Sequence, residues 1–285
     1  MGRVARSFKL VEASWEVLKA DREIMLLPLM SFASMLVVLL VFGGVAVGTG
    51  AFDHRQLTAS GYVALGLLYL AVSFIGIFFN AAVVGAANIR LSGGDPTVAD
   101  GLRAARSKAG KIFSWAMVTA TVGLILRTIE QKVGLVGRIV VALIGAAWSI
   151  VTFFVVPILL FEDLGVADSI KRSGTLFRER WGEEFTGNVS IGLAIFLVFL
   201  PVAVVSLVLT LALPPVGILV GFVGIGLVAT AGSAMTGIFN AALYRYATAG
   251  DASGPFDSDQ LREAFRQKRR VRGRRPAGPA DPAAG

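Results

Sequence analysis

Six long apolar stretches dominate the chain, and short blocks of charged residues separate them. A transmembrane helix needs about 20 apolar residues to cross roughly 30 Å of hydrocarbon. The stretches are continuous rather than alternating, and backbone groups inside lipid must be paired, so helices rather than barrel strands are expected. The pattern predicts an all-α, polytopic membrane protein whose six transmembrane helices form three hairpins. The predicted spans are 24–48, 61–89, 112–129, 135–161, 189–213 and 216–246.

A charged segment with apolar residues at helical spacing precedes each predicted hairpin. In residues 1–23, Phe8, Val11, Trp15 and Leu18 recur at intervals of three or four, which marks one face of an α-helix. Similar stripes precede the second and third hairpins, and a fourth amphipathic helix is expected within residues 251–275. Such helices lie at the membrane interface, where they either only connect the spans or form a collar that binds a partner or lipid headgroups.

Capping patterns predict where two of these helices begin. Asp95 is the expected N-cap of the second amphipathic helix, with Pro96 at its first helical position. Asp257 and Gln260 have the spacing of a capping box in the fourth helix. The chain therefore divides into an amphipathic helix at 1–23, a membrane domain at 24–250, a capped helix with a polybasic segment at 251–275, and a Pro/Ala/Gly-rich tail at 276–285 that is expected to be disordered.

Two short matches predict an internal repeat. The sequence Phe-Asn-Ala-Ala occurs at 79–82 and again at 239–242, towards the ends of the second and sixth spans. Val-Ala-Asp occurs at 98–100 and at 166–168, at the start of two charged segments. Both matches fit a unit of one amphipathic helix and one hairpin that is used three times. The repeat predicts that Asn80 and Asn240 lie at similar depth in the membrane.

The charge distribution predicts the orientation of the chain. Of the 27 Lys and Arg residues, 23 lie in residues 1–23, in the second-to-third and fourth-to-fifth connections, and from the end of the sixth span onwards. Cytoplasmic segments carry the excess of Lys and Arg, so both termini are expected in the cytoplasm and the chain in the cell membrane. The net charge of +8 then reflects topology and attraction to anionic lipid more than nucleic-acid binding.

No constellation of catalytic or metal-ligating residues stands out in the sequence. The chain has no cysteine, and no carboxylates cluster near its single histidine, His54, so thiolate chemistry, a zinc site and a catalytic triad are not expected. Glu162 and Asp163 are adjacent and point to different sides of a helix, which makes them a poor acid/base pair. They are expected to pair with basic residues such as Lys171 and Arg172. We therefore expect no enzymatic activity and no cofactor.

Asn80 and Asn240 are the candidate site residues inside the spans, because charged residues are essentially confined to the span ends. An amide in a bilayer commonly forms an interhelical hydrogen bond, which is worth about 1 kcal/mol. The alternative is that the two amides line a path for a solute.

Small residues and prolines are expected to shape the packing of the spans. Gly217 and Gly221 form a GxxxG pattern, which favours close helix packing within the chain or, as the alternative, in a homo-oligomer. Pro157 and Pro201 each remove a helical hydrogen bond and are expected to kink the fourth and fifth spans.

The segment 266–275 holds seven basic residues in ten and follows closely on the last span. Such a segment is typical of a contact with anionic lipid headgroups, worth about 1 kcal/mol per cation near the surface. Nucleic-acid binding is the second interpretation, because basic runs are not specific. The candidate lipid-contact residues are Arg269, Arg270, Arg272, Arg274 and Arg275.

Loose motifs also carry a family resemblance over about residues 7–250. The chain resembles an uncharacterised family of prokaryotic six-span integral membrane proteins, a domain of unknown function, at Ser14-Trp15, Leu18-Lys19, Asp21-Arg22-Glu23, Pro28 and Ser31. It is similar to a wider group of six-span proteins, which includes the membrane domain fused to some glycerophosphodiesterases, at Pro157, Glu162-Asp163, Ser169 and Lys171-Arg172-Ser173. The resemblance implies six spans and supplies no activity or site.

Two functional hypotheses follow from these observations. The first is a non-catalytic scaffold or envelope-assembly component that binds a cytoplasmic protein partner through its amphipathic helices. The second is a transporter or channel for a small or lipid-like solute. A proton-driven carrier is not favoured, because such carriers need ionisable residues inside the membrane. A packed interior at Asn80 and Asn240 favours the scaffold, and a polar cavity there favours transport.

Overall fold

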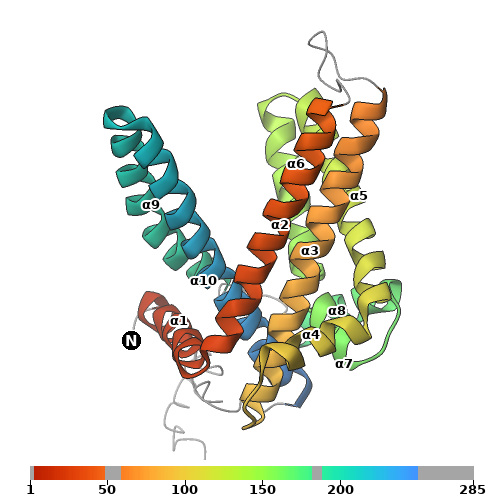
Figure 1. The fold of residues 1–285 in the computed structure, drawn as a ribbon. Helices are drawn as coiled ribbons and strands as arrows, with labels where there is room; N and C mark the ends of the chain where they lie inside the picture. Colours follow the sequence, from red (N-terminus) through yellow and green to blue (C-terminus); the bar gives the residue numbers. More distant parts are fainter. Residues whose placement is uncertain (1–2, 49–58, 182–187, 250–285) are drawn as a thin grey trace, which may run out of the picture.

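The structure is a computed structural model, and it describes residues 3–48, 59–181 and 188–249. Every regular element in these ranges is an α-helix (Figure 1). The helices are α1 (Arg3–Ala20), α2 (Arg22–Gly48), α3 (Ala59–Leu91), α4 (Val98–Ser107), α5 (Ala109–Lys132), α6 (Leu135–Val151), α7 (Val155–Phe161), α8 (Val166–Trp181), α9 (Asn188–Ala212) and α10 (Pro214–Ala249).

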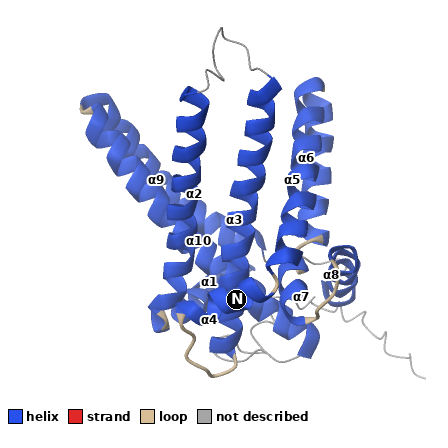
Figure 2. Ribbon diagram, turned by 45° about the vertical axis from the view of Figure 1, so that its right-hand side comes forward, coloured by secondary structure: helices blue, strands red, loops and turns tan. Residues whose placement is uncertain are grey.

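Six segments are long and apolar enough to cross a membrane, which confirms the predicted fold class and makes the chain a polytopic membrane protein. They are Arg22–Gly48, Gly61–Leu91, Ala109–Lys132, Leu135–Phe161, Ile195–Ala212 and Pro214–Ala249. The bounds agree closely with the predicted spans, because the bilayer thickness fixes the length of each apolar run. Figure 2 shows the helices α2, α3, α5 and α6 standing upright above the shorter helices, while the α9–α10 hairpin leans away from them.

The amphipathic helices α1, α4 and α8 gather at one end of the hairpins, called the inner end below (Figure 1). Each precedes one hairpin, so the chain forms three units: α1–α3, α4–α7 and α8–α10. The helix and tail predicted for residues 251–285 lie outside the described residues, as do the side chains of Phe8 and Val11.

The predicted start of α4 is wrong by two residues. Thr97 is the N-cap: its side chain accepts a hydrogen bond from the Asp100 amide, and the Asp100 carboxylate accepts one from the Thr97 amide. This reciprocal capping box satisfies two amides that a helix start leaves unpaired. Asp95, the predicted cap, instead pairs with Arg90 at 3.4 Å, and Pro96 lies before the helix.

The buried face of α1 differs in part from the predicted stripe. Leu18 is buried as expected, whereas Trp15 is exposed and lies beneath the Lys19 ammonium, which is 5.8 Å from its ring. The helix buries Ala13 and Val17 beside Leu18, on the face that packs against α9 and α10. Trp15 was therefore wrongly included in the predicted apolar face of α1.

The fourth span is broken where Pro157 predicts a kink. Residues 152–154 form a turn between α6 and α7. Proline has no amide hydrogen to donate to the carbonyl of Phe153, four residues earlier, and its ring clashes with that carbonyl. By contrast, α9 runs through Pro201 as one continuous helix.

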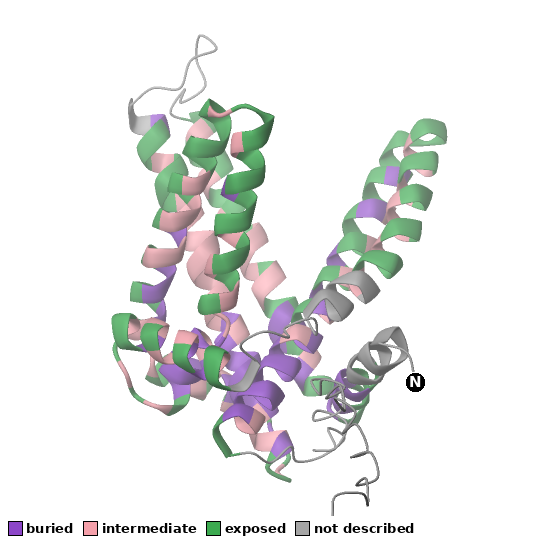
Figure 3. Cartoon of the chain, turned by 180° about the vertical axis from the view of Figure 1, so that it is seen from behind, coloured by how far each residue is buried: buried purple, intermediate pink, exposed green. Residues whose placement is uncertain are grey.

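Buried side chains concentrate at the inner end (Figure 3). The core is formed by the start of α2, the last turns of α3 and α10, and the short helices α4, α7 and α8. The outer parts of the spans expose Leu, Val and Ile side chains, as expected of surfaces that face lipid. We call this compact inner end, with α1 docked on it, the platform.

Candidate functional site

Polar contacts connect the three units of the platform in a closed ring, and this ring is the candidate functional site. Unit α1–α3 contacts unit α4–α7 through Glu23, unit α4–α7 contacts unit α8–α10 through Glu162, and unit α8–α10 returns to the first through Arg245. The contacts of Glu23 with Val98, of Glu162 with Tyr244 and of Arg245 with Asn88 each join segments that are far apart in the sequence, so together they fix how the hairpins are arranged.

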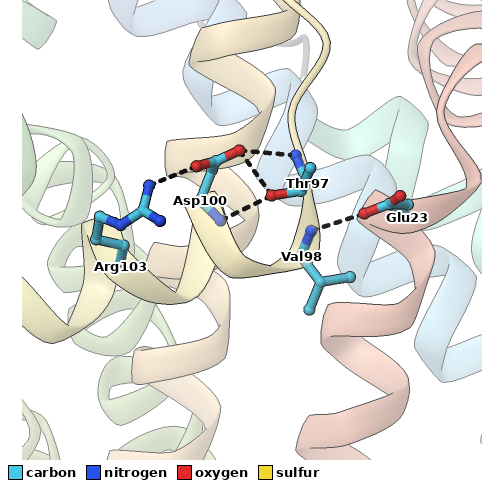
Figure 4. A network of polar contacts seen from close by, with 5 residues as sticks. All are labelled: Glu23, Thr97, Val98, Asp100 and Arg103. Atoms are coloured by element: carbon cyan, nitrogen blue, oxygen red, sulfur yellow. Dashed lines mark hydrogen bonds and ion pairs between the residues drawn. The ribbon is translucent and has the colours of Figure 1, made fainter.

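The contact between the first two units lies at the start of α4 (Figure 4). The Glu23 carboxylate accepts a hydrogen bond from the Val98 amide at 2.9 Å. That amide belongs to the first turn of α4, where no intrahelical partner exists and the helix dipole favours a negative charge. The neighbouring Asp100 carboxylate accepts a hydrogen bond from the Thr97 hydroxyl and pairs with Arg103. The pKa of Asp100 is lowered, mainly by the hydrogen bonds that its carboxylate accepts from Thr97.

Asp21, which lies between α1 and α2, fixes the backbone of Glu23 through a hydrogen bond. Its carboxylate accepts the Glu23 amide at 3.2 Å, which caps the start of α2. The side chain is buried beside the loop between α3 and α4, and this burial raises the pKa of Asp21. The motif Asp21-Arg22-Glu23 therefore positions one helix start and contacts another.

Glu162 joins the second unit to the third. Its carboxylate accepts hydrogen bonds from the Arg172 guanidinium and from the Tyr244 hydroxyl, each at 3.0 Å. The predicted pairing of Glu162 with Arg172 is therefore confirmed. Glu162 lies directly after α7, so it connects the break in the fourth span to both α8 and the end of α10.

Side chains of the third unit also satisfy the broken backbone of the fourth span. The Asn240 amide donates to the Phe153 carbonyl at 3.2 Å, and the Ser173 hydroxyl accepts the Phe154 amide at 3.0 Å. Irregular backbone at membrane depth is tolerated only where such partners are present. Asn240 and Ser173 therefore make the break at Pro157 sustainable inside the protein.

Arg245 closes the ring between the third unit and the first. Its guanidinium donates to the Asn88 side-chain oxygen at 3.2 Å and to the Ser92 hydroxyl. Asn88 lies in the last turn of α3, Ser92 directly follows that helix, and Arg245 lies near the end of α10. The two helices run in the same direction, so this contact ties their inner ends together.

Asp163 makes a further contact within the second unit. Its backbone is left-handed, with φ 55°, and its carboxylate pairs with both Lys108 and Lys111. The hydrogen bonds from these two ammonium groups lower the pKa of Asp163 to about 2. Asp163 was expected to pair with the basic residues of α8, but the left-handed turn directs it to the start of α5 instead.

The structure brings the two Phe-Asn-Ala-Ala segments together. A Cβ atom added at Gly237 would lie 2.5 Å from Val83 and 3.7 Å from the Asn80 amide nitrogen, so α10 packs tightly on this part of α3. Asn240 lies one turn further along α10 and is only 8% exposed. Its neighbours Phe239 and Ala241 are buried too, so the surroundings of Asn240 are packed.

One atom in this packed region is left without a partner. The Asn240 side-chain oxygen is buried and makes no hydrogen bond within the described ranges. Such an unpaired acceptor is a feature that a solute path would use, which makes Asn240 the sharpest position at which to test the two functional hypotheses.

The remaining candidate residues are placed as follows. The candidate lipid-contact residues lie outside the described residues; they are Arg269, Arg270, Arg272, Arg274 and Arg275.

Within residues 3–48, 59–181 and 188–249, no group of three or more His, Cys, Asp or Glu side chains is arranged to hold a metal ion.

Most residues of the ring of polar contacts were not predicted as functional from the sequence. The pattern Asp-Arg-Glu at 21–23 was noted only as part of a family resemblance, and Asn88, Tyr244 and Arg245 were not selected. Their only sequence signal is a polar side chain in the last turns of an otherwise apolar span, which many lipid-anchoring residues share.

Comparison with known proteins gives one family match. A family model described as "Family of unknown function (DUF6159)" matches residues 59–254, which is more than half of the chain. No curated protein and no solved structure matched.

Proposed function

Because the chain belongs to the DUF6159 family, whose description assigns no activity, we propose from the structure that it is a non-catalytic membrane scaffold. Its working surface is the platform, where α1, α4 and α8 present one rigid face to a protein partner. The hairpins hold that face at the membrane surface.

The closed ring of polar contacts is the observation that carries this proposal. Transport by alternating access requires one group of helices to rock against another around a central site. In this molecule Glu23, Glu162 and Arg245 connect all three units at the same end. Rocking there would break several charged hydrogen bonds at once, each worth about 1.5–3 kcal/mol. A fixed platform suits assembly better than transport.

The two carboxylates that follow α7 have structural partners that account for their presence. Glu162 is engaged by Arg172 and Tyr244, and Asp163 by two lysines. Neither carboxylate is left to act as a general base, so we propose that the platform binds rather than catalyses.

The distribution of basic residues supports an orientation with the platform in the cytoplasm, since 23 of the 27 Lys and Arg residues lie in the segments that the sequence pattern assigns to the cytoplasmic side. We further propose that the basic segment 266–275 holds this end against anionic headgroups. A cytoplasmic protein is then the partner that meets the exposed sides of α1, α4 and α8.

Cysteine accessibility tests the scaffold against a solute path. The chain contains no cysteine, so single variants Asn80→Cys, Asn240→Cys and Ser107→Cys can be labelled one at a time in membrane vesicles. Ser107 is exposed at the end of α4 and serves as the positive control. A small, water-soluble methanethiosulfonate is expected to label Ser107→Cys and to leave Asn240→Cys unlabelled, because the packed surroundings of Asn240 admit no water. Asn80 is only half-buried, so Asn80→Cys gives an intermediate reference.

Labelling of Asn240→Cys in a correctly folded variant would overturn the scaffold and favour transport. Folding is checked by the elution profile of each detergent-solubilised variant. Denatured samples, in which all three variants must react, show that the introduced thiols are intact.

A further inference from the structure

A single buried residue, Asp21, separates α1 from α2. Its amide donates to the Val17 carbonyl at 3.1 Å and so continues the last turn of α1. The helix that ends here packs on α9 and α10 of the third unit more than on α2 of its own unit. Asp21 is therefore the hinge between the first hairpin and a helix that is docked on a different unit.

The two carboxylate oxygens of Asp21 have different surroundings. The Oδ1 atom accepts the Glu23 amide at 3.2 Å. The Oδ2 atom is buried and makes no hydrogen bond to any part of the chain that the structure describes. An ionised oxygen that is buried without a donor is costly, and such a group commonly takes up a proton and becomes neutral. The geometry therefore favours the protonated form of Asp21.

The charged groups around Asp21 do not offset its burial. Arg90, near the end of α3, attracts the Asp21 carboxylate, but its guanidinium pairs with Asp95 at 3.4 Å. Asp95 itself and Glu23 on α2 are like charges that oppose the ionisation of Asp21. Lys19, near the end of α1, lies over an aromatic ring instead. Burial is accordingly the main cause of the raised pKa of Asp21.

We propose that protonation of Asp21 controls the docking of α1 on the third unit. With the proton bound, Asp21 remains buried and α1 stays packed on α9 and α10. Loss of the proton leaves a charge on Oδ2, and this charge is hydrated when the hinge opens and the end of α1 loosens. The inference goes beyond the scaffold role, because it makes the shape of the platform depend on pH whatever partner the platform binds.

The change Asp21→Asn separates the charge of this residue from its hydrogen bond to Glu23. Asparagine still offers an oxygen to the Glu23 amide, as an N-cap does, but it cannot ionise. Because the pKa of Asp21 is raised in the folded state, its contribution to stability is complete below the ordinary value of 3.8 and is lost as the pH rises through the raised value. Asp21→Asn is not subject to this loss.

The first measurement is the unfolding midpoint of the full chain in mixed micelles with dodecyl sulfate, at about pH 4 and at about pH 8. Between these values we expect the midpoint of Asp21→Asn, relative to wild type, to shift to a higher proportion of dodecyl sulfate. An unchanged difference would overturn the proposal. A shift in the opposite direction would also overturn it, because Arg90 would then stabilise ionised Asp21 within the fold.

Asp95→Asn is the matched control. Asp95 belongs to the same group of charges, but its side chain is 95% exposed. Its removal is expected to give no such rise of the midpoint relative to wild type between the two pH values. A rise of equal size in Asp95→Asn would overturn the proposal, because the total negative charge of the group, rather than the burial of Asp21, would then explain the effect.

A second measurement reports on the docking of α1 itself. Ala13 is buried on the face of α1 that packs against α9 and α10, so Ala13→Cys should react with a water-soluble methanethiosulfonate only when α1 loosens. At about pH 8, we expect the labelling of Ala13→Cys to be slower when Asp21→Asn is also present. The rate is normalised to that of Ser107→Cys on α4, which should not change.

Equal normalised rates with and without Asp21→Asn in folded protein would overturn the proposal. If Ala13→Cys does not elute as a folded protein from detergent, the unfolding midpoints of Asp21→Asn and Asp95→Asn decide the question without it.

Discussion

Asn240 illustrates how one side chain can stabilise a distant defect in the backbone. Pro157 leaves the Phe153 carbonyl without its helical donor, and the Asn240 amide supplies a substitute at 3.2 Å. The cost of an unpaired carbonyl inside a membrane explains why an amide is found at this position of α10.

Replacing Asn240 with leucine should therefore destabilise the protein by about 1 kcal/mol, the typical value of an interhelical hydrogen bond in a bilayer. The measurement is the unfolding free energy in mixed micelles of a mild detergent and dodecyl sulfate. In a Pro157→Ala background, residue 157 regains an amide donor for Phe153, so the same Asn240→Leu change should cost less. Equal costs in the two backgrounds would show that Asn240 does not compensate for the proline.

Asp163 gives a prediction that depends on pH. Its pKa is lowered from 3.8 to about 2, so the lysine contacts stabilise the fold fully above about pH 5, and this stabilisation is lost progressively as the pH falls through 2. Asp163→Asn keeps a side chain that tolerates the left-handed backbone but removes the charge. We expect the stability difference between wild type and Asp163→Asn to be constant above about pH 5 and to shrink steadily down to about pH 2. A difference that stays constant from about pH 6 to about pH 2 would contradict this account.

The sequence indicates several of these residues but not their partners. The repeated motif singles out Asn240, and Pro157 predicts the break, yet nothing in the sequence says that the two meet. Arg245 and Asn88 are 157 residues apart, and their contact depends on two parallel helices ending at the same level. Such contacts follow from how the hairpins pack, which local patterns do not determine.

At the level of elements, the spans were predictable because their length is set by the bilayer rather than by neighbouring helices. Helix starts were less predictable, because adjacent residues competed for the capping role. Asp95-Pro96 and Thr97-Val98 both have the composition of a cap followed by a first helical residue, and only the second is used. Trp15 similarly has the spacing of a core residue but lies at the exposed edge of α1.

The choice of cap can be tested directly. Thr97→Ala should destabilise the protein by about 1 kcal/mol, the usual cost of losing an N-cap side chain. Asp95→Ala is the matched control and should cost less, since it removes only an exposed ion pair at 3.4 Å. Unfolding of both variants under the same detergent conditions provides the comparison. A larger loss for Asp95→Ala would support the cap that the sequence suggested.

For the whole molecule, the arrangement of helices predicts which surfaces share one side of the membrane. Ser107 on α4 and Thr175 on α8 are both exposed at the inner end. Cysteines at these two positions should react with an impermeant maleimide only from the cytoplasmic side, and a cysteine at position 54 should react only from the opposite side. Labelling of positions 107 and 175 from different sides would exclude the three-unit arrangement.

The ring at the platform also has a consequence for biosynthesis. A ribosome delivers α1 to α3 long before α10, so Asn88 and Ser92 must wait for Arg245, and Glu162 must wait for Tyr244. Until the final turns of α10 emerge, the nascent chain carries polar groups whose native partners do not yet exist. Those turns act as a latch, and a chain arrested before them would remain open to the quality-control proteases of the membrane.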